Sequence, residues 1–128
     1  MQNYEAKLAH NPKELEAFLT PLVTAGIDIF HCSQRRFWEP EFEKSHLNLA
    51  GWVKKISSKP TITVGSIGLD ADFISNPDQR GFSEAEPASL NELLTRLDND
   101  EFDLIAVGRA LISNPNWVTV SYTHLRAH

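Results

Sequence analysis

The chain has 128 residues, and its 12 Lys and Arg against 17 Asp and Glu give a formal net charge of −5. This acidic balance argues against a nucleic-acid partner, because phosphate contacts require a basic face. The hydrophobic share of 41% and the charged share of 23% are those of a globular chain rather than a disordered one. No run approaches the roughly 18 apolar residues of a membrane-spanning helix, and the N-terminus lacks a signal-peptide pattern. We therefore expect a cytoplasmic protein without a membrane partner, whose single cysteine, Cys32, excludes an internal disulfide.

The first helix–strand unit is predicted over residues 12–32. Its helix, residues 12–25, follows Asn11, which is placed to cap it, and Glu14 has the spacing of a capping box. Gly26 is a natural end for this helix, and residues 27–32 are predicted to form a short buried strand. Apolar residues recur along one side of the helix at helical spacing: Leu15, Phe18, Leu19, Leu22 and Val23.

A second unit follows a polar and aromatic loop, residues 33–46. Residues 61–64 are β-branched and are predicted to form its strand, which ends at Gly65. The helix before this strand has one apolar side, formed by Leu49, Trp52, Val53 and Ile56.

A third unit follows a long loop over residues 66–88. Ser89 and Glu92 have the spacing of a capping box, so the third helix is expected to begin there. Residues 102–107 are predicted to form the third strand, which leads into a short apolar turn.

Helices and strands therefore alternate, with no hairpin signal between the strands. This order predicts an α/β chain whose three strands pair in parallel, as in a (β/α)₈ barrel or a doubly wound sheet. Three strands leave sheet edges and one face uncovered, so we expect residues 1–120 to be part of a larger domain. Residues 121–128 carry no reliable apolar stripe and are expected to be a non-native tail.

Two neighbouring strand ends carry residues suited to a phosphate group. Gly65 and Gly108 allow an anion to approach the backbone, Ser66 adds a hydroxyl, and Arg109 adds a guanidinium fork. A short helix starting near Arg109 would point its positive end at the same anion. In parallel α/β folds, ligands bind beyond the carboxyl ends of the strands. The alternative is that both glycines only form tight turns and that Arg109 pairs with a surface carboxylate.

The loop after the first strand is rich in cationic and aromatic residues. Phe37 or Trp38 could form the wall of a flat ligand site, with Arg35 or Arg36 facing a carbonyl or phosphate. Alternatively, the aromatic residues pack over the rim of the sheet while the arginines pair with the nearby acidic residues Glu39, Glu41 and Glu43.

Other polar residues give weaker signals. His31 is expected to be a packed, hydrogen-bonded residue, and Cys32 a small buried hydrophobic one. The histidines have no metal-ligand spacing, so no metal site is predicted. Lys54 and Lys55 are expected to lie on a solvated helix face.

Several segments together resemble the Old Yellow Enzyme family of NADH:flavin oxidoreductases, over about residues 4–118. The segments that carry this resemblance are residues 25–33 (AGIDIFHCS), 36–42 (RFWEPEF), 47–52 (LNLAGW), 59–66 (KPTITVGS) and 102–111 (FDLIAVGRAL). Members of this family are FMN-containing (β/α)₈ barrels, and this chain is similar to their C-terminal part, from helix five to strand eight.

The resemblance implies FMN as the cofactor, bound through its phosphate by Gly65, Ser66, Gly108 and Arg109. It also implies NADH or NADPH as the reductant and a small-molecule substrate, an activated alkene such as an α,β-unsaturated carbonyl. The loop with Arg36, Phe37 and Trp38 would then border the substrate site. Ser66 stands where the family often has asparagine or glycine.

In this family, the residues that hold the substrate carbonyl and the tyrosine that donates a proton lie in the earlier half of the barrel. We therefore assign no catalytic residue and expect the 128-residue chain to be inactive alone. Two alternatives remain open: a flavin dehydrogenase of another substrate class, and a phosphate-binding half-barrel module without catalysis. The oligomeric state is open as well.

Overall fold

The computed structural model describes residues 6–68 and 87–126. Their elements, in chain order, are α1 (Pro12–Thr24), β1 (Phe30–Ser33), α2 (Leu49–Ser57), β2 (Thr61–Val64), α3 (Pro87–Asp98), β3 (Leu104–Ile105), α4 (Arg109–Ser113) and α5 (Trp117–Arg126). Of the predicted loop over residues 66–88, residues 69–86 lie outside the described part.

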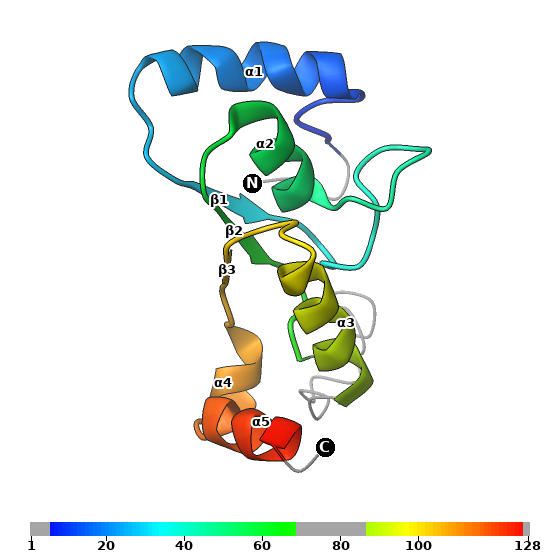
Figure 1. The fold of residues 1–128 in the computed structure, drawn as a ribbon, viewed down its shortest axis with the longest axis vertical. Helices are drawn as coiled ribbons and strands as arrows, with labels where there is room; N and C mark the ends of the chain where they lie inside the picture. The colour runs from blue at the N-terminus through cyan, green and yellow to red at the C-terminus, as the bar shows by residue number, and fades with distance from the viewer. Residues whose placement is uncertain (1–5, 69–86, 127–128) are drawn as a thin grey trace.

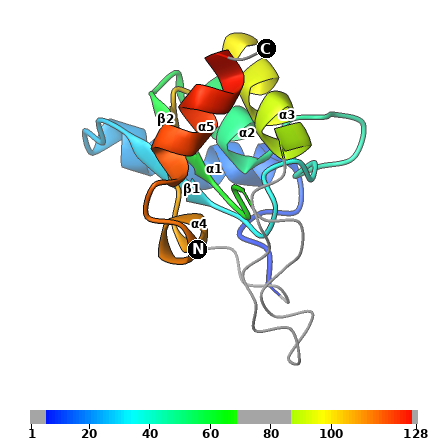
Figure 2. The ribbon, with the colours of Figure 1, turned by 90° about the horizontal axis from the view of Figure 1, so that it is seen from below.

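The three strands form one parallel sheet in the order β1-β2-β3, which confirms the predicted α/β class and strand pairing. Phe30 lies opposite Thr61, and Ile62 lies opposite Leu104. Helix α2 packs on β1 and β2, and α1 packs on α2. In Figure 1, α1 and α2 lie above the strands, and α3, α4 and α5 lie below them. Figure 2 shows α5 beside α3.

The two faces of the sheet differ in how they are covered. Cys32, Thr61 and Thr63 share one face through the strand register, and all three are buried. On the opposite face His31 is exposed, and Leu104 keeps 53% of its surface exposed. The sheet of the described residues is therefore open, with a buried helix-facing side and a partly uncovered second side.

Asn11 caps α1 as predicted, because its side-chain oxygen accepts a hydrogen bond from the Glu14 backbone at 2.9 Å. The Glu14 carboxylate, however, accepts from the backbone N–H of His10, at 2.7 Å, rather than from Asn11. This bond to the backbone of His10 is the main cause that lowers the pKa of Glu14. Leu15 and Leu19 of the predicted stripe are buried, whereas Phe18 is 44% exposed.

Two predicted strands are shorter in the structure. The first begins at Phe30, not residue 27, because pairing starts where Phe30 donates to the Pro60 carbonyl at 3.1 Å. The amide of Ile27 instead bonds back to Leu22 in α1, at 3.3 Å. The third strand is Leu104–Ile105 rather than residues 102–107, although single backbone bonds to β2 continue on both sides of it.

The predicted start of the third helix was also wrong. The third helix begins at Pro87, so Ser89 lies inside it and the predicted capping box does not form its start. Proline suits the first turn of a helix, since the missing N–H has no partner there. Residues 121–126 continue α5, which begins at Trp117, whose amide donates to the Asn114 carbonyl at 2.9 Å. The non-native origin of residues 121–128 stays a prediction.

Within the described ranges, no helix combines the length and apolar character that crossing a membrane requires.

Candidate phosphate site at the carboxyl ends of the strands

The structure brings together the two predicted strand-end segments. The guanidinium Nη2 of Arg109 donates to the Ser66 hydroxyl at 3.3 Å, across 43 positions of sequence. Ser66 follows β2 and Arg109 follows β3, and these strands are neighbours in the sheet. A cation and a hydroxyl thus meet beyond the carboxyl ends of two parallel strands, where α/β folds place ligands.

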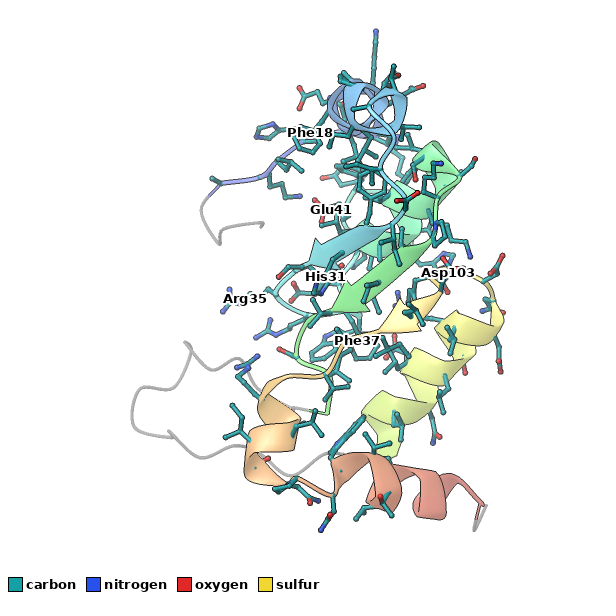
Figure 3. All side chains as sticks on the ribbon, turned by 90° about the vertical axis from the view of Figure 1, so that its left-hand side faces the viewer. Phe18, His31, Arg35, Phe37, Glu41 and Asp103 are labelled. Atoms are coloured by element: carbon teal, nitrogen blue, oxygen red, sulfur yellow. The ribbon has the colours of Figure 1, made fainter. Side chains whose placement is uncertain are left out.

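Ser66 is bound on both sides and has an unusual backbone. Its hydroxyl donates to the Arg35 carbonyl at 2.9 Å, while its oxygen accepts from Arg109. Its φ of 52° lies in the left-handed region that glycine and asparagine adopt more easily than other residues. Asparagine and glycine, which the flavin oxidoreductases that this chain resembles often have at this position, adopt this conformation more easily than serine does. Figure 3 shows Arg35 on the side toward which the strand arrows point.

The two predicted glycines have different structural roles. A side-chain carbon at Gly65 would lie 2.6 Å from the Gln34 carbonyl oxygen, so close packing of the loop after β1 requires glycine there. At Gly108 such a carbon would meet no atom within 4 Å. The position next to Gly108 is therefore open, whereas Gly65 is needed for internal packing, as the tight-turn alternative expects.

The helix expected near Arg109 is present but short. Helix α4 has five residues, Arg109–Ser113, and its preceding residue, Gly108, provides no side-chain cap. So short a helix has a small dipole. The end of α4 therefore adds little to the Arg109 guanidinium and the Ser66 hydroxyl as groups suited to an anion.

The predicted substrate residues are mostly held by internal contacts. Phe37 is fully buried, and its ring meets Trp38 edge-on with 5.1 Å between the ring centroids. Arg36 forms an ion pair with Glu39 at 2.8 Å. These contacts are the ones expected if the loop packs on the rim of the sheet. Of the three predicted substrate residues, Arg36 and Trp38 are partly exposed and Phe37 is not.

The side-chain amides of two residues, which the sequence analysis did not identify as important, hold this loop in position through hydrogen bonds. Gln34 donates to the Arg36 carbonyl at 2.7 Å and accepts from the Leu49 amide at 2.8 Å. The fully buried Asn48 donates to the Phe37 carbonyl at 3.0 Å and to the Thr63 hydroxyl at 3.1 Å, and it also caps α2. Only the Asn48 cap has a sequence signal, since Asn is a favoured N-cap residue.

No protein-family model, curated protein or solved structure matches this chain. The relationship to the flavin oxidoreductases therefore stays a prediction that rests on the sequence motifs.

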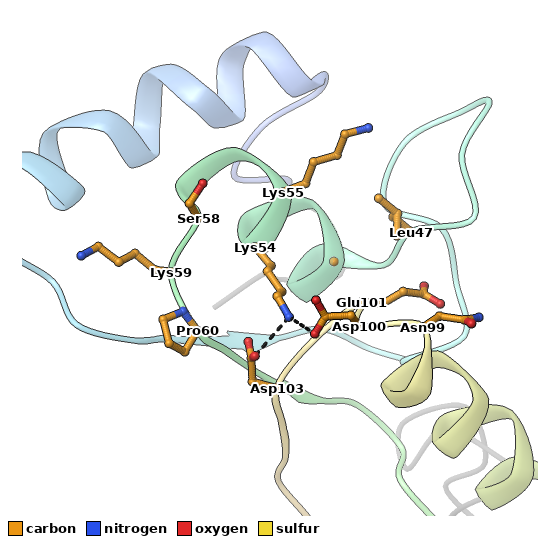
Figure 4. A pocket seen from close by; sticks show the side chains of 11 residues that line it. Leu47, Lys54, Lys55, Ser58, Lys59, Pro60, Asn99, Asp100, Glu101 and Asp103 are labelled. Carbon is orange, nitrogen blue, oxygen red and sulfur yellow. Dashed lines mark hydrogen bonds and ion pairs between the residues drawn. The ribbon is translucent and has the colours of Figure 1, made fainter.

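A second polar cluster lies at the amino ends of the strands, on a groove of about 490 Å³ (Figure 4). The Lys54 ammonium binds Asp100 at 2.6 Å and Asp103 at 3.1 Å, and the Lys54 side chain is only 20% exposed. The prediction of a solvated Lys54 was therefore wrong. Helical periodicity shows which side of a helix is polar, but not which acidic residues a later loop brings to it.

The pKa values of Lys54 and Asp103 are both shifted in the direction that favours their charged forms. Burial by itself lowers the pKa of Lys54, but hydrogen bonds to Asp100 and Asp103 outweigh this effect, and the net pKa is raised. Burial by itself raises the pKa of Asp103, but the Thr61 N–H, at 2.9 Å, and Lys54 outweigh it. The net pKa of Asp103 is lowered.

Cys32 is buried and lies on the helix-facing side of the sheet. Burial raises the pKa of its thiol to about 12, so the thiol is protonated and unreactive at neutral pH. Within residues 6–68 and 87–126, no three His, Cys, Asp or Glu side chains group in a way that could hold a metal ion.

Proposed function

We propose that this chain is the phosphate-binding part of an FMN-dependent flavin oxidoreductase, a cytoplasmic (β/α)₈ barrel that reduces activated alkenes with NADH or NADPH. The observation that carries the proposal is the contact between Arg109 and Ser66 at the ends of two adjacent parallel strands. Guanidinium and hydroxyl groups are suitable donors for phosphate oxygens. The open space at Gly108 is consistent with an approaching ligand.

The open face of the sheet supports the barrel component of the proposal. In a (β/α)₈ barrel, helices cover the outer face of the strands and side chains fill the interior. Here the helix-facing side is buried, whereas His31 and Leu104 on the other side are exposed. Further strands of a barrel would cover these side chains.

Each part of the proposed site has its own task. Arg109 and Ser66 would hold the cofactor phosphate, and the loop with Arg36 and Trp38 would border the substrate. Bound FMN would supply hydride transfer from NAD(P)H to the β-carbon of the alkene. The chain's own residues would fix the position of that cofactor and limit access to it.

A comparison of FMN with riboflavin tests the proposal, because the two differ in the phosphate. FMN is expected to bind the full 128-residue chain, with quenching of flavin fluorescence, and riboflavin is expected to bind far more weakly. Arg109→Ala should weaken FMN binding about 10- to 100-fold, the effect of losing a charged hydrogen bond, and leave riboflavin binding unchanged. Lys59→Ala, at the opposite end of the strands, is the matched loss of a cation and should change neither. Equal affinity for both flavins would overturn the proposal.

The alternative of a non-catalytic phosphate module is favoured by the same donor pair, because Arg109 and Ser66 recognise a phosphate whatever it is attached to. NADH oxidation in the presence of FMN separates the two functions. We expect no oxidation by this chain alone, since the family's substrate-binding histidines and proton-donating tyrosine have no counterpart in it. Flavin-dependent oxidation by the purified chain would contradict that expectation.

A further inference from the structure

The loop after β1 is bonded directly to the loop after β2. The Arg35 carbonyl accepts the Ser66 hydroxyl proton at 2.9 Å, and the Phe37 amide donates to the Gly65 carbonyl at 3.0 Å. A side chain at Gly65 would clash with the Gln34 carbonyl, so the two backbones lie in close contact. The loop that carries Arg36 and Trp38 therefore lies on the segment that we propose binds phosphate.

The Ser66 hydroxyl cannot donate to two acceptors at once. It has a single proton, which it donates to the Arg35 carbonyl, while its oxygen accepts from Arg109. A phosphate that accepts hydrogen bonds from both Arg109 and Ser66 must take that proton position. The hydrogen bond to Arg35 is then lost, so the neighbouring bond from the Phe37 amide to the Gly65 carbonyl loses a supporting contact and opens more often.

We propose that Ser66 couples the two loops. In the free chain its hydroxyl donates to the Arg35 carbonyl in the loop after β1. When an anion binds, the hydroxyl rotates to the phosphate, and residues 34–37 become looser. This coupling rests on the proposed function, because it assigns the phosphate to the Arg109–Ser66 pair. It adds a regulatory role, in which occupation of the phosphate site adjusts the loop beside the substrate. By linkage, a ligand that holds the loop in its present form would weaken phosphate binding by the same factor.

The left-handed backbone of Ser66 provides a matched pair of variants. Ser66→Ala removes the hydroxyl and keeps the unfavourable φ of 52°, whereas Ser66→Gly removes the hydroxyl and relieves it. Both variants should uncouple the loops. If Ser66→Ala does not fold, Ser66→Gly still gives the result.

Amide hydrogen exchange of the full chain, with and without saturating FMN or inorganic phosphate, tests the proposal. The measured quantity is the exchange rate of the Phe37 amide divided by that of the Leu15 amide, which donates to the Asn11 carbonyl at the start of the distant helix α1. This ratio of rates does not change when a ligand stabilises the whole chain uniformly. In the wild-type chain, ligand should raise the ratio about three- to ten-fold, the effect of losing one hydrogen bond. In Ser66→Ala and Ser66→Gly the ratio should be high without ligand and should not change with it.

The outcomes separate this inference from the proposed function. If FMN binds and the wild-type ratio is unchanged, the coupling is wrong and the FMN proposal stands. If inorganic phosphate raises the ratio but FMN does not bind, the coupling stands and the flavin function fails. If neither ligand binds, both are overturned. A ligand-dependent rise that persists in both Ser66 variants would also refute the role of the hydroxyl.

Discussion

The two ends of the sheet are built in different ways, although each joins segments that are far apart in the sequence. At the amino end, Lys54 is paired with Asp100 and Asp103, and Asp103 also accepts the Thr61 N–H. At the carboxyl end, Arg109 meets a neutral hydroxyl at 3.3 Å, on a residue with a left-handed backbone. Figure 3 shows Asp103 and Arg35 at these opposite ends. The amino-end contacts join opposite charges, whereas the contact between Arg109 and Ser66 joins a guanidinium to a hydroxyl, two donor groups that suit phosphate oxygens.

The largest effect is expected where the loop at the carboxyl end enters the core. Phe37→Ala should lower the free energy of unfolding by about 3–5 kcal/mol, because the ring is fully buried. Phe18→Ala is the matched control, with a ring that is 44% exposed, and should cost less than about 1 kcal/mol. Chemical denaturation measures both. Equal losses would mean that the loop is not part of the core and that Phe37 is free to serve a ligand.

A smaller loss is expected at the amino end. Asp103→Ala should lower the free energy of unfolding by about 1–3 kcal/mol, since the buried Thr61 N–H loses its acceptor. Lys59→Ala, a change on the same groove, should stay within about 0.5 kcal/mol of the wild type. A neutral result for Asp103→Ala would show that the amino-end cluster is a surface feature rather than a structural one.

The same cluster predicts how stability depends on pH. Because the pKa of Asp103 is lowered on folding, its contribution is complete above the ordinary value of 3.8 and is lost as the pH falls through the folded pKa. The raised pKa of Lys54 has the opposite sign, so its contribution is complete below 10.5 and is lost as the pH rises through the folded value. In Asp103→Asn the decline in unfolding free energy below pH 4 should be shallower than in the wild type. If the unfolding free energies of the two proteins declined equally below pH 4, Asp103 would not be the source of this pH dependence.

The smallest effects compare two serines with left-handed backbones, one at each end. Ser58, the exposed C-cap of α2, has a φ of 58°, and Ser66 has 52°. Ser58→Gly should raise the free energy of unfolding by about 0.5–1 kcal/mol, because glycine adopts this conformation without strain. Ser66→Gly should gain a similar amount but lose the hydrogen bonds to Arg35 and from Arg109, each worth about 1 kcal/mol, for a net loss of about 1 kcal/mol. A clear gain at both positions would mean that the Ser66 hydroxyl contributes nothing to stability.

How far the sequence predicts this molecule depends on the range of the interaction. Residues that act within one turn, such as the Asn11 cap, give a local signal and were predicted correctly. The Ser66–Arg109 contact was also predictable, because neighbouring parallel strands bring their carboxyl ends to one edge. Lys54 and Asp103 are 49 positions apart, and nothing in either local pattern indicates that they meet. The short extent of β3 was missed because the apolar pattern does not show where regular pairing gives way to the single backbone bonds from Asp103 and Ala106.

The arrangement of the strands has a consequence for how the protein is made. In the described sheet, spatial order and chain order coincide, so each strand pairs with the strand that was synthesised just before it. As the polypeptide leaves the ribosome, β2 finds β1 already available, and β3 then finds β2. A sheet that inserts a late strand between two early ones must instead keep a gap open until that strand arrives. Here translation and sheet growth can proceed in the same direction, which shortens the time during which an unpaired strand edge waits for its partner.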